Sequence, residues 1–318
     1  MVQVDLITGF LGAGKTTFLR KYVHWLNARG QRVCILENDF GAVNVDVMLL
    51  QDLLGDNCDI ETISGGCDCD THQRRMRTKL ISLAMQGFDR VLVEPSGIFD
   101  VDEFYDVLRD EPLDRWYTLG NVIAIVDALL ETQLSPQGEY LLASEAASAG
   151  MVLMSRCQLA APGQAEATLA HLNRALEACH CARRFAADTD ALCKPWDALT
   201  DADMQRLDSC GQCQASYVKL HFDEHKAFTS LYFMELHLTL PQLQDAARAL
   251  FADPVCGRIL RIKGFLQTVD GWCELNATRD TMHVEAIPDG QEVLIIIGEE
   301  LDRSAIEAHI GQKTADQE

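Results

Sequence analysis

The 318-residue sequence predicts an α/β fold, in which a mostly parallel, helix-covered sheet is followed by a smaller α+β domain. Three observations support this prediction. Strand and helix signals alternate over residues 1 to about 160, which is typical of a parallel sheet with crossover helices. A Gly-rich loop joins the first predicted strand to the first predicted helix. From residue 217 the order of signals changes, and we place the two domains at residues 1–210 and 211–318.

Continuous apolar runs predict the strands of the first domain, because a strand covered on both faces is apolar at nearly every position. We expect strands at residues 2–7, 32–37, 88–93, 121–126 and 151–154. Helices are expected at residues 16–29, 74–86, 101–108, 138–149 and 164–179, and Gly30 ends the first of them. Residues 181–215 are polar and irregular, and we interpret them as the end of this domain plus a linker.

The second domain has a different order of predicted elements. Alternation over residues 228–240 predicts a strand, and residues 242–251 have a helical pattern. Strands are expected at residues 259–267, 281–286 and 293–297, and a closing helix at residues 303–310. This order is typical of a small α+β unit.

The composition is that of a globular protein with an acidic surface. Hydrophobic residues make up 48% of the chain, charged residues 24%, and the formal net charge is −21. This charge argues against a general nucleic-acid or anionic-membrane surface. We expect no leader and no run of about 18 apolar residues, and therefore a cytoplasmic protein. Twelve cysteines then indicate metal ligands, redox groups or core residues rather than a disulfide framework.

A loop near the amino terminus, GFLGAGKT at residues 9–16, matches the P-loop pattern G-x-x-x-x-G-K-[ST] between a strand and a helix. Its glycines let backbone N–H groups surround phosphates at a helix N-terminus. Lys15 is expected to contact the β- and γ-phosphates, and the Thr16 hydroxyl to bind Mg²⁺. An ordinary Gly-rich turn is the alternative. The predicted nucleotide-binding residues here are Gly9, Gly12, Ala13, Gly14, Lys15, Thr16 and Thr17.

A carboxylate closes another buried strand, in the sequence VLVEPSG at residues 91–97. Glu94 is where a Walker-B residue binds Mg²⁺, and Gly97 can offer its N–H to the γ-phosphate. A chance acidic strand end is the alternative. With Lys15, these two residues are the predicted catalytic groups.

Two further stretches carry candidate ligands for a transition metal. Glu37 and Asp39 follow the second strand, at the sheet edge where α/β proteins bind ligands. Cys67 and Cys69 lie on a Gly-rich turn followed by Asp70. Thiolates with a carboxylate suit Zn²⁺ or a similar ion such as Co²⁺. A redox pair, inert thiols and solvent-facing carboxylates are the alternatives.

These stretches together resemble the CobW family of P-loop GTPases, which are related to HypB and UreG. The resemblance rests on GFLGAGKTT (9–17), ENDFG (37–41), GGCDC (65–69) and EPSG (94–97), and in the tail on RIKGF (261–265) and IGEELD (297–302). It therefore spans nearly the whole chain. It implies a GTPase in which the nucleotide state controls a metal near the cysteines, and delivery of that metal to a client metalloprotein or cofactor-assembly protein. We also expect a nucleotide-dependent homodimer.

The sequence departs from the family at its metal and guanine motifs. The third cysteine of the family's Cys-x-Cys-Cys is Asp70 here, and a hard carboxylate alters metal affinity and selectivity. The family's Asn-Lys-x-Asp aligns with SRCQ at residues 155–158. Gln158 offers one neutral carbonyl where an Asp accepts both guanine N–H groups, while Arg156 is expected to stack over the base. The choice between GTP and ATP stays open.

Four other cysteines have the spacing of a zinc site. They form a Cys-x-Cys and a Cys-x-x-Cys pair and predict a four-thiolate site, with reduced, unligated thiols as the alternative: Cys179, Cys181, Cys210 and Cys213. Asp127, at the end of a strand, is interpreted as a helix N-cap. Cys256 and Cys273 suggest no site.

The leading functional hypothesis is a nucleoside triphosphatase whose hydrolysis drives metal delivery. A nucleotide-dependent regulatory or binding protein with little hydrolysis is the second hypothesis, and the changes at Asp70 and Gln158 motivate it. A small-molecule kinase is the third, and the absence of an Arg-rich lid disfavours it.

Overall fold

The computed structural model describes residues 1–10, 12–39, 45–64, 69–95, 101–213, 215–220, 228–234, 236–287 and 289–311. The chain divides into two compact units, Met1–His221 and Phe222–Glu318. The boundary expected after residue 210 falls within the first unit. There Gln212 pairs with Ala149, and the Cys213 N–H donates to Ser148 O at 3.0 Å.

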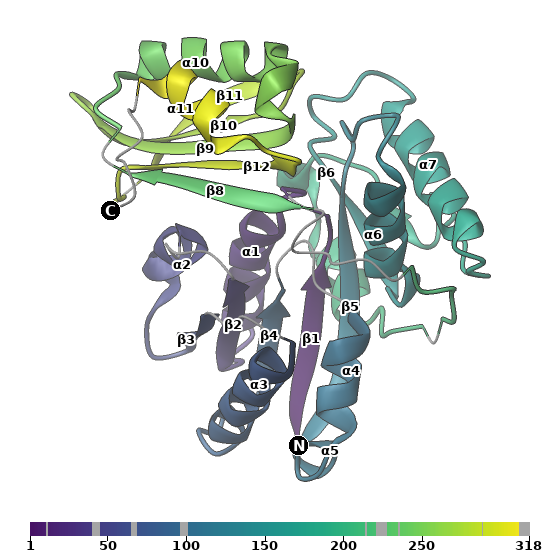
Figure 1. Ribbon diagram of the computed structural model, residues 1–318. Helices are drawn as coiled ribbons and strands as arrows, with labels where there is room; N and C mark the ends of the chain where they lie inside the picture. The colour runs from purple at the N-terminus through teal and green to yellow at the C-terminus, as the bar shows by residue number, and fades with distance from the viewer. Residues whose placement is uncertain are drawn as a thin grey trace. The chain divides into compact units, whose positions relative to one another are not determined.

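A seven-stranded sheet forms the centre of the first unit, in the order β3-β2-β4-β1-β5-β6-β7. Every neighbouring pair is parallel, which confirms the predicted α/β class. Because parallel strands end at one edge, the carboxyl ends of β1, β2, β4 and β6 lie along that edge (Figure 1). The strands are β1 (Val2–Thr8), β2 (Val33–Asp39), β3 (Cys58–Ser64), β4 (Arg90–Glu94), β5 (Tyr117–Asp127), β6 (Met151–Ser155) and β7 (Ala191–Leu192).

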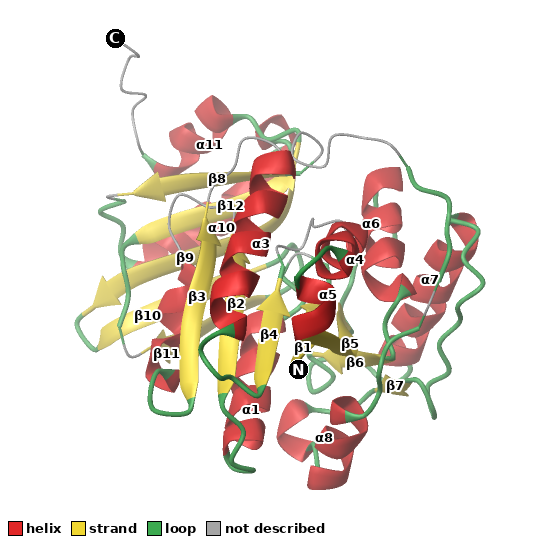
Figure 2. Cartoon of the chain, turned by 90° about the horizontal axis from the view of Figure 1, so that it is seen from below, coloured by secondary structure: helices red, strands yellow, loops and turns green. Residues whose placement is uncertain are grey.

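Helices cover both faces of this sheet (Figure 2). Successive strand residues point to opposite faces, so Leu6 packs in one core and Ile7 in the other. The first core receives α3 (Cys69–Ala84), α4 (Val101–Arg109), α6 (Pro136–Ala147) and α7 (Gln164–Ala178). The second receives α1 (Lys15–Asn27), α2 (Val45–Leu50) and α8 (Asp201–Asp208). The short helix α5 (Leu113–Trp116) precedes β5.

A buried polar cluster joins α8 to three strands. Arg90 is 5% exposed, and its Nη1 donates to Asp5 Oδ2 at 2.9 Å and forms an ion pair with Asp208. Tyr22 Oη donates to Asp208 Oδ1 at 2.8 Å, and the Asn121 N–H donates to Asp5 Oδ1 at 2.8 Å. The region predicted to be an irregular linker therefore contributes a helix that is bound to the first unit.

The second unit contains a five-stranded antiparallel sheet in the order β11-β10-β9-β12-β8. Leu250 of α10 and Ile306 of α11 share one core with Ile262 and Leu294 of the sheet. The elements are β8 (Thr229–Met234), α10 (Leu240–Ala252), the 3₁₀ turn η3 (Pro254–Cys256), β9 (Arg258–Thr268), β10 (Gly271–Ala277), β11 (Met282–Ile287), β12 (Val293–Glu299) and α11 (Arg303–Ile310).

Some elements differ from the sequence-based prediction for clear reasons. The predicted strand at 228–240 ends earlier, because Thr239 and Gln242 form a capping box that begins α10, with Thr239 N donating to Gln242 Oε1 at 2.9 Å. β3 was not expected because it lies at the sheet edge and mixes apolar with acidic residues. β10 was not expected either.

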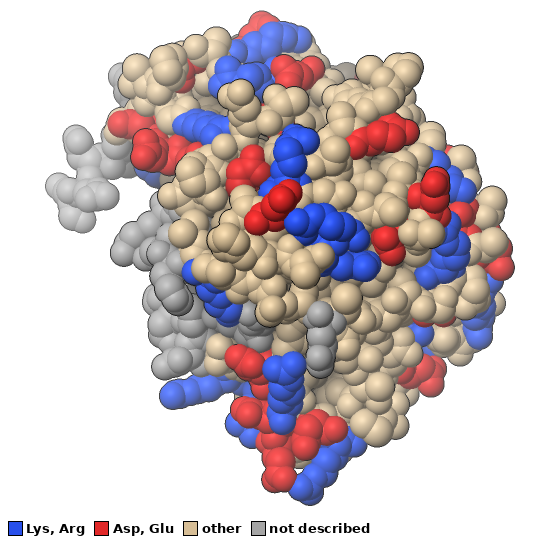
Figure 3. Space-filling view, turned by 90° about the vertical axis from the view of Figure 1, so that its right-hand side faces the viewer, with Lys and Arg blue, Asp and Glu red and all other residues tan. Residues whose placement is uncertain are grey.

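Two surface features of the described residues bear on partners. No helix among them combines the length and apolar character that crossing a bilayer requires. On the face seen in Figure 3, basic side chains are interspersed with acidic ones.

Candidate nucleotide-binding site

Two residues of the loop after β1, Gly9 and Gly14, have backbone angles that favour glycine. Gly9 has a φ of 143°, and a Cβ there would lie 2.3 Å from Ile125 O, so only glycine permits this contact with β5. Gly14 has a φ of 103° and is the N-cap of α1. The loop therefore delivers the chain directly into a helix N-terminus, which is an anion-binding arrangement.

Lys15 is the first residue of α1 and is 7% exposed. The Nζ of Lys15 donates to Gly9 O at 2.9 Å, and this hydrogen bond joins the end of the loop to its beginning. The ammonium group and the helix N-terminus thus place positive charge together, where a phosphate chain would be neutralised.

Oxygen groups from three elements converge beside this loop. Thr16 Oγ1 donates to Glu94 Oε1 at 2.9 Å, joining α1 to the end of β4. Glu37 of β2 is in register with Glu94 on the adjacent parallel strand, so the two side chains point to the same face of strands that lie about 4.8 Å apart. Both are buried, at 2% and 4% exposure. The Thr16 hydroxyl and the Glu94 carboxylate are oxygen donors of the kind that suits Mg²⁺, and Glu37 stays a candidate ligand of the transition metal.

The loop after β6 contacts the P-loop through Arg156. This residue has a φ of 55°, forms an ion pair with Asp127 and donates from Nη2 to Gly12 O at 3.0 Å. Asp127 is not a helix N-cap, because its Oδ1 accepts from the Leu129 N–H at 2.9 Å in a turn. The guanidinium group predicted to stack over a base is held in these two contacts, and Gln158 lies exposed in a turn.

Trp196 lies beside the P-loop residue Gly14, and the sequence analysis did not identify it. Its Nε1 donates to Met154 O at 2.8 Å, and its ring lies 3.3 Å from where a Gly14 Cβ would be. Lys21 of α1 donates to Trp196 O at 2.9 Å. A tryptophan in a polar segment gives no motif signal, so only the fold could identify it.

Part of the predicted transition-metal site lies outside the described residues, namely Cys67, together with the predicted switch residue Gly97. Asp39 ends β2, and Cys69 and Asp70 begin α3; the structure describes the backbone of these three. Glu37 is the one predicted ligand whose side-chain burial is described. The ligand set stays a prediction.

The structure does not bring the other four cysteines together. Cys181 is buried in the core on one face of the sheet, whereas Cys210 packs against the core on the opposite face. The Cys210 thiol donates to Val122 O at 3.8 Å. No three of these four thiols lie within 4.8 Å of one another. Their sequence spacing suggested a zinc site, but the intervening sheet separates them.

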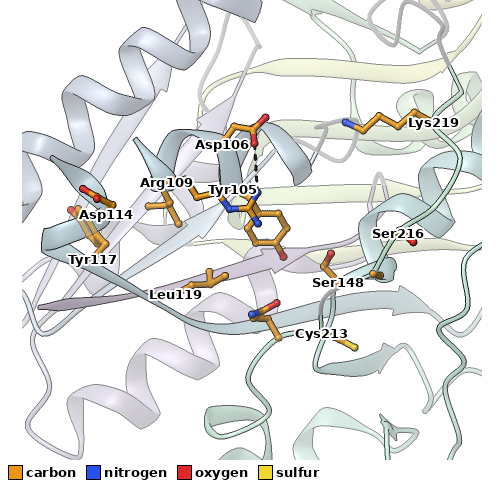
Figure 4. A pocket seen from close by; sticks show the side chains of 13 residues that line it. Tyr105, Asp106, Arg109, Asp114, Tyr117, Leu119, Ser148, Cys213, Ser216 and Lys219 are labelled. Carbon is orange, nitrogen blue, oxygen red and sulfur yellow. Dashed lines mark ion pairs between the residues drawn. The ribbon is translucent and has the colours of Figure 1, made fainter. Parts of the chain in front are cut away.

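A pocket of about 950 Å³ lies elsewhere on the first unit (Figure 4). Tyr117 and Leu119, from the beginning of β5, and Lys219 line it, with an ion pair of 3.8 Å between Arg109 and Asp106. The amino ends of parallel strands lie at the edge opposite their carboxyl ends. The pocket is therefore separate from the P-loop.

Comparisons with known proteins identify similar sequences for both parts of the chain. The family profile "CobW/HypB/UreG, nucleotide-binding domain" matches residues 3–185, and "Cobalamin synthesis protein cobW C-terminal domain" matches residues 235–313. The zinc chaperone YjiA of Escherichia coli is 34% identical over 175 residues, which are 52% of this chain and 52% of that protein. The zinc-regulated GTPase metalloprotein activator 1 of Schizosaccharomyces pombe is 30% identical over 132 residues, 40% of this chain and 32% of that protein.

The chain thus spans about half the length, or less, of these curated relatives. Among solved structures, the crystal structure of Zn(II)-bound YjiA GTPase from E. coli aligns over 98% of both chains with 21% identity and a TM-score of 0.37. The first family profile alone covers more than half of the 318 residues. The chain therefore belongs to the CobW/HypB/UreG family of P-loop nucleotide-binding proteins.

Proposed function

We propose that this protein is a Mg²⁺-dependent nucleoside triphosphatase, acting on GTP, that couples hydrolysis to the binding of Zn²⁺ or a similar transition metal and its delivery to a client. The register of Glu37 with Glu94 carries this proposal. Because of this register, Glu37, a candidate ligand of the transition metal, lies beside Glu94. Glu94 in turn accepts a hydrogen bond from Thr16, the expected Mg²⁺ ligand. The names of the relatives, zinc chaperone and GTPase metalloprotein activator, support it.

In the proposed hydrolysis, the chain's residues position the triphosphate and stabilise developing charge. Lys15 exchanges its hydrogen bond to Gly9 O for the phosphate oxygens, and the loop amides surround them. Thr16 and Glu94 would hold Mg²⁺, which would neutralise negative charge on the triphosphate. Water then attacks the phosphorus of the γ-phosphate, the bond from that phosphorus to the bridging oxygen of the β-phosphate breaks, and the nucleoside diphosphate leaves. The proton of the water passes to the released phosphate, and Gly97 is the proposed backbone donor to the γ-phosphate.

Coupling between nucleotide and metal is proposed to pass through β2 and β4. A change in the contacts of Glu94 would act on its neighbour Glu37 and on the end of β2, where Asp39 lies. The thiolates of Cys67 and Cys69, with Asp70, complete the proposed metal site. The proposed partner is a client metalloprotein or cofactor-assembly protein, and a nucleotide-dependent homodimer is the proposed assembly.

The test is the dissociation constant of Zn²⁺ measured without nucleotide, with GDP and with a non-hydrolysable GTP analogue. We expect at least about a fivefold difference between the two nucleotide states, and the reciprocal effect of Zn²⁺ on nucleotide affinity. Glu37→Gln should reduce this difference. Glu61→Gln, on the adjacent strand and paired with Lys79, is the matched control and should retain it. Equal Zn²⁺ affinities in all states would disprove the coupling.

The second candidate is a nucleotide-dependent regulator with little turnover. The two residues predicted to contact the nucleotide base, Arg156 and Gln158, favour it. Gln158 is exposed, and Arg156 is engaged by Asp127 and Gly12 O. Phosphate release under single-turnover conditions separates the two candidates. Tight nucleotide binding without release favours the regulator, and titrations with GTP and ATP reveal the base preference.

A further inference from the structure

Three potential metal ligands of the second unit lie together, although the sequence gave no reason to group them. The ligand atoms of Asp253, Cys256 and His309 all lie within 4.8 Å of one another, and this is the one such group of three or more among the described residues. Asp253 follows α10, Cys256 ends η3, and His309 belongs to the last turn of α11. The fold brings His309 to the other two across more than fifty residues of sequence.

The group has a buried end and an open end. Cys256 is 0% exposed, and its thiol makes no hydrogen bond to a described residue. The side chains of Asp253 and His309 are 32% and 28% exposed, and Asp253 Oδ2 lies 2.8 Å from His309 Nε2. A sulfur therefore lies beneath an oxygen and a nitrogen that solvent can reach.

Backbone contacts hold the three residues in place. The Cys256 N–H donates to Asp253 O at 3.2 Å, and Cys256 O accepts from the Asp302 N–H at 3.3 Å. Asp253 Oδ1 accepts from the Val255 N–H at 3.0 Å, which leaves Oδ2 directed toward the histidine. Next to the cysteine, Gly257 has a φ of 91°, and a Cβ there would lie 2.3 Å from Glu300 O. The loop is thus packed closely against the start of α11.

We propose that Asp253, Cys256 and His309 form a binding site for Zn²⁺ or a similar thiophilic divalent cation. One thiolate, one imidazole and one carboxylate are all established zinc ligands. Ligands at about 2.0–2.3 Å from a tetrahedral ion lie roughly 3.3–3.7 Å apart. The ligand atoms of the three residues, which lie within 4.8 Å of one another, would reach that spacing through side-chain movements on the order of 1 Å.

The chemistry of the group favours an exchangeable ion over a structural one. Three protein ligands leave the fourth position open, whereas structural zinc is held by four. The cation displaces the proton of the Cys256 thiol, which passes to solvent. The site does not depend on the proposed metal site in the first unit.

The alternative is that Asp253 and His309 form an ion pair that stabilises α11 without binding a metal. A basic residue in the last turn of a helix, paired with a carboxylate, stabilises the helix without any metal. An Asn at position 253 separates the two roles. Its single amide oxygen can accept from the Val255 N–H and its NH2 group can donate to His309 Nε2, but the anionic ligand is removed.

The experiment uses full-length Cys67→Ser/Cys69→Ser protein, so that the proposed site of the first unit is not counted. Co²⁺ is titrated while the thiolate-to-Co²⁺ charge-transfer absorption is recorded, and Zn²⁺ affinity is measured by chelator competition. We expect Cys256→Ser to remove one Co²⁺ equivalent and its charge-transfer band. Cys273→Ser, which changes another buried cysteine of the same unit, is the matched control and should leave both unchanged.

Two further variants keep the test decisive if Cys256→Ser fails to fold. Asp253→Asn and His309→Asn should each weaken Zn²⁺ binding by at least about tenfold, since even outer-shell changes cost 10–100-fold. Thermal unfolding in EDTA checks that these variants fold. If Asp253→Asn, or a folded Cys256→Ser, binds Co²⁺ and Zn²⁺ like its parent, the group is only an ion pair and the proposal is overturned.

Discussion

Thr16 Oγ1 donates a hydrogen bond of 2.9 Å to Glu94 Oε1, and this contact joins residues that are 78 positions apart in the sequence. It connects the N-terminus of the P-loop helix to the end of a central strand. In the proposed function, the same two groups hold Mg²⁺. The contact therefore identifies the residue pair whose alteration should separate nucleotide binding from hydrolysis.

Thr16→Ala should lower Mg²⁺-dependent hydrolysis by about 10²-fold or more, because a preorganised group beside the transferring phosphate is lost. Thr16→Ser retains the hydroxyl and should restore most of the rate. Phosphate release under single-turnover conditions provides the measurement. A wild-type rate in Thr16→Ala would exclude this threonine from the Mg²⁺ site.

Arg156→Ala should weaken GTP and ATP binding by a similar factor of about ten, since it removes a charged hydrogen bond to Gly12 O that involves no base. Fluorescent nucleotide titrations give both affinities. The control is Arg109→Ala, whose exposed guanidinium pairs with Asp106 far from the loop. A loss for one nucleotide only would instead assign Arg156 to base recognition.

Arg90→Met should destabilise the first unit by about 3–5 kcal/mol, because Asp5, which is 0% exposed, would keep a buried charge without its partner. Urea unfolding followed by circular dichroism measures the change. The exposed pair of Arg115 with Glu111 provides the comparison, and Arg115→Ala should cost less than about 1 kcal/mol. Similar midpoints for the two variants would show that the cluster contributes little.

Asp203 should make stability depend on pH in the acid range. Burial raises its pKa, but hydrogen bonds from Lys194 and Thr200 outweigh burial and lower the pKa to about 2. An unfolded Asp has a pKa of about 3.9, so the stabilisation is complete above about pH 4 and is lost as the pH falls toward about 2.

The difference in unfolding free energy between wild type and Asp203→Asn should therefore shrink over this interval. Unfolding is followed with urea at several pH values. A difference that stays constant over this interval would contradict the pKa shift.

The phosphate-binding half of the candidate site could be predicted because its residues are contiguous. Gly9, Gly14 and Lys15 lie within one loop, and the backbone angles and packing that demand glycine there are local. Glu94 was predictable as the end of an apolar run. The parallel sheet followed from the alternation of strand and helix signals, and the structure confirms it.

Pairings across the chain were decided by strand order and register, which depend on packing between distant segments. Glu37 lies beside Glu94 only because β2 and β4 are neighbours in this register. The same physics separates Cys181 from Cys210, despite their zinc-like spacing, by placing a sheet between them.

The sequence by itself determined that this protein holds a P-loop and which of its residues are expected to contact phosphates. Tertiary structure alone decided which other groups meet that loop, Arg156 and Trp196 among them. It also decided that Asp253, Cys256 and His309 meet. The reason is that a motif is encoded by covalent neighbours, whereas a site built from distant segments exists only after the sheet and its helices have packed.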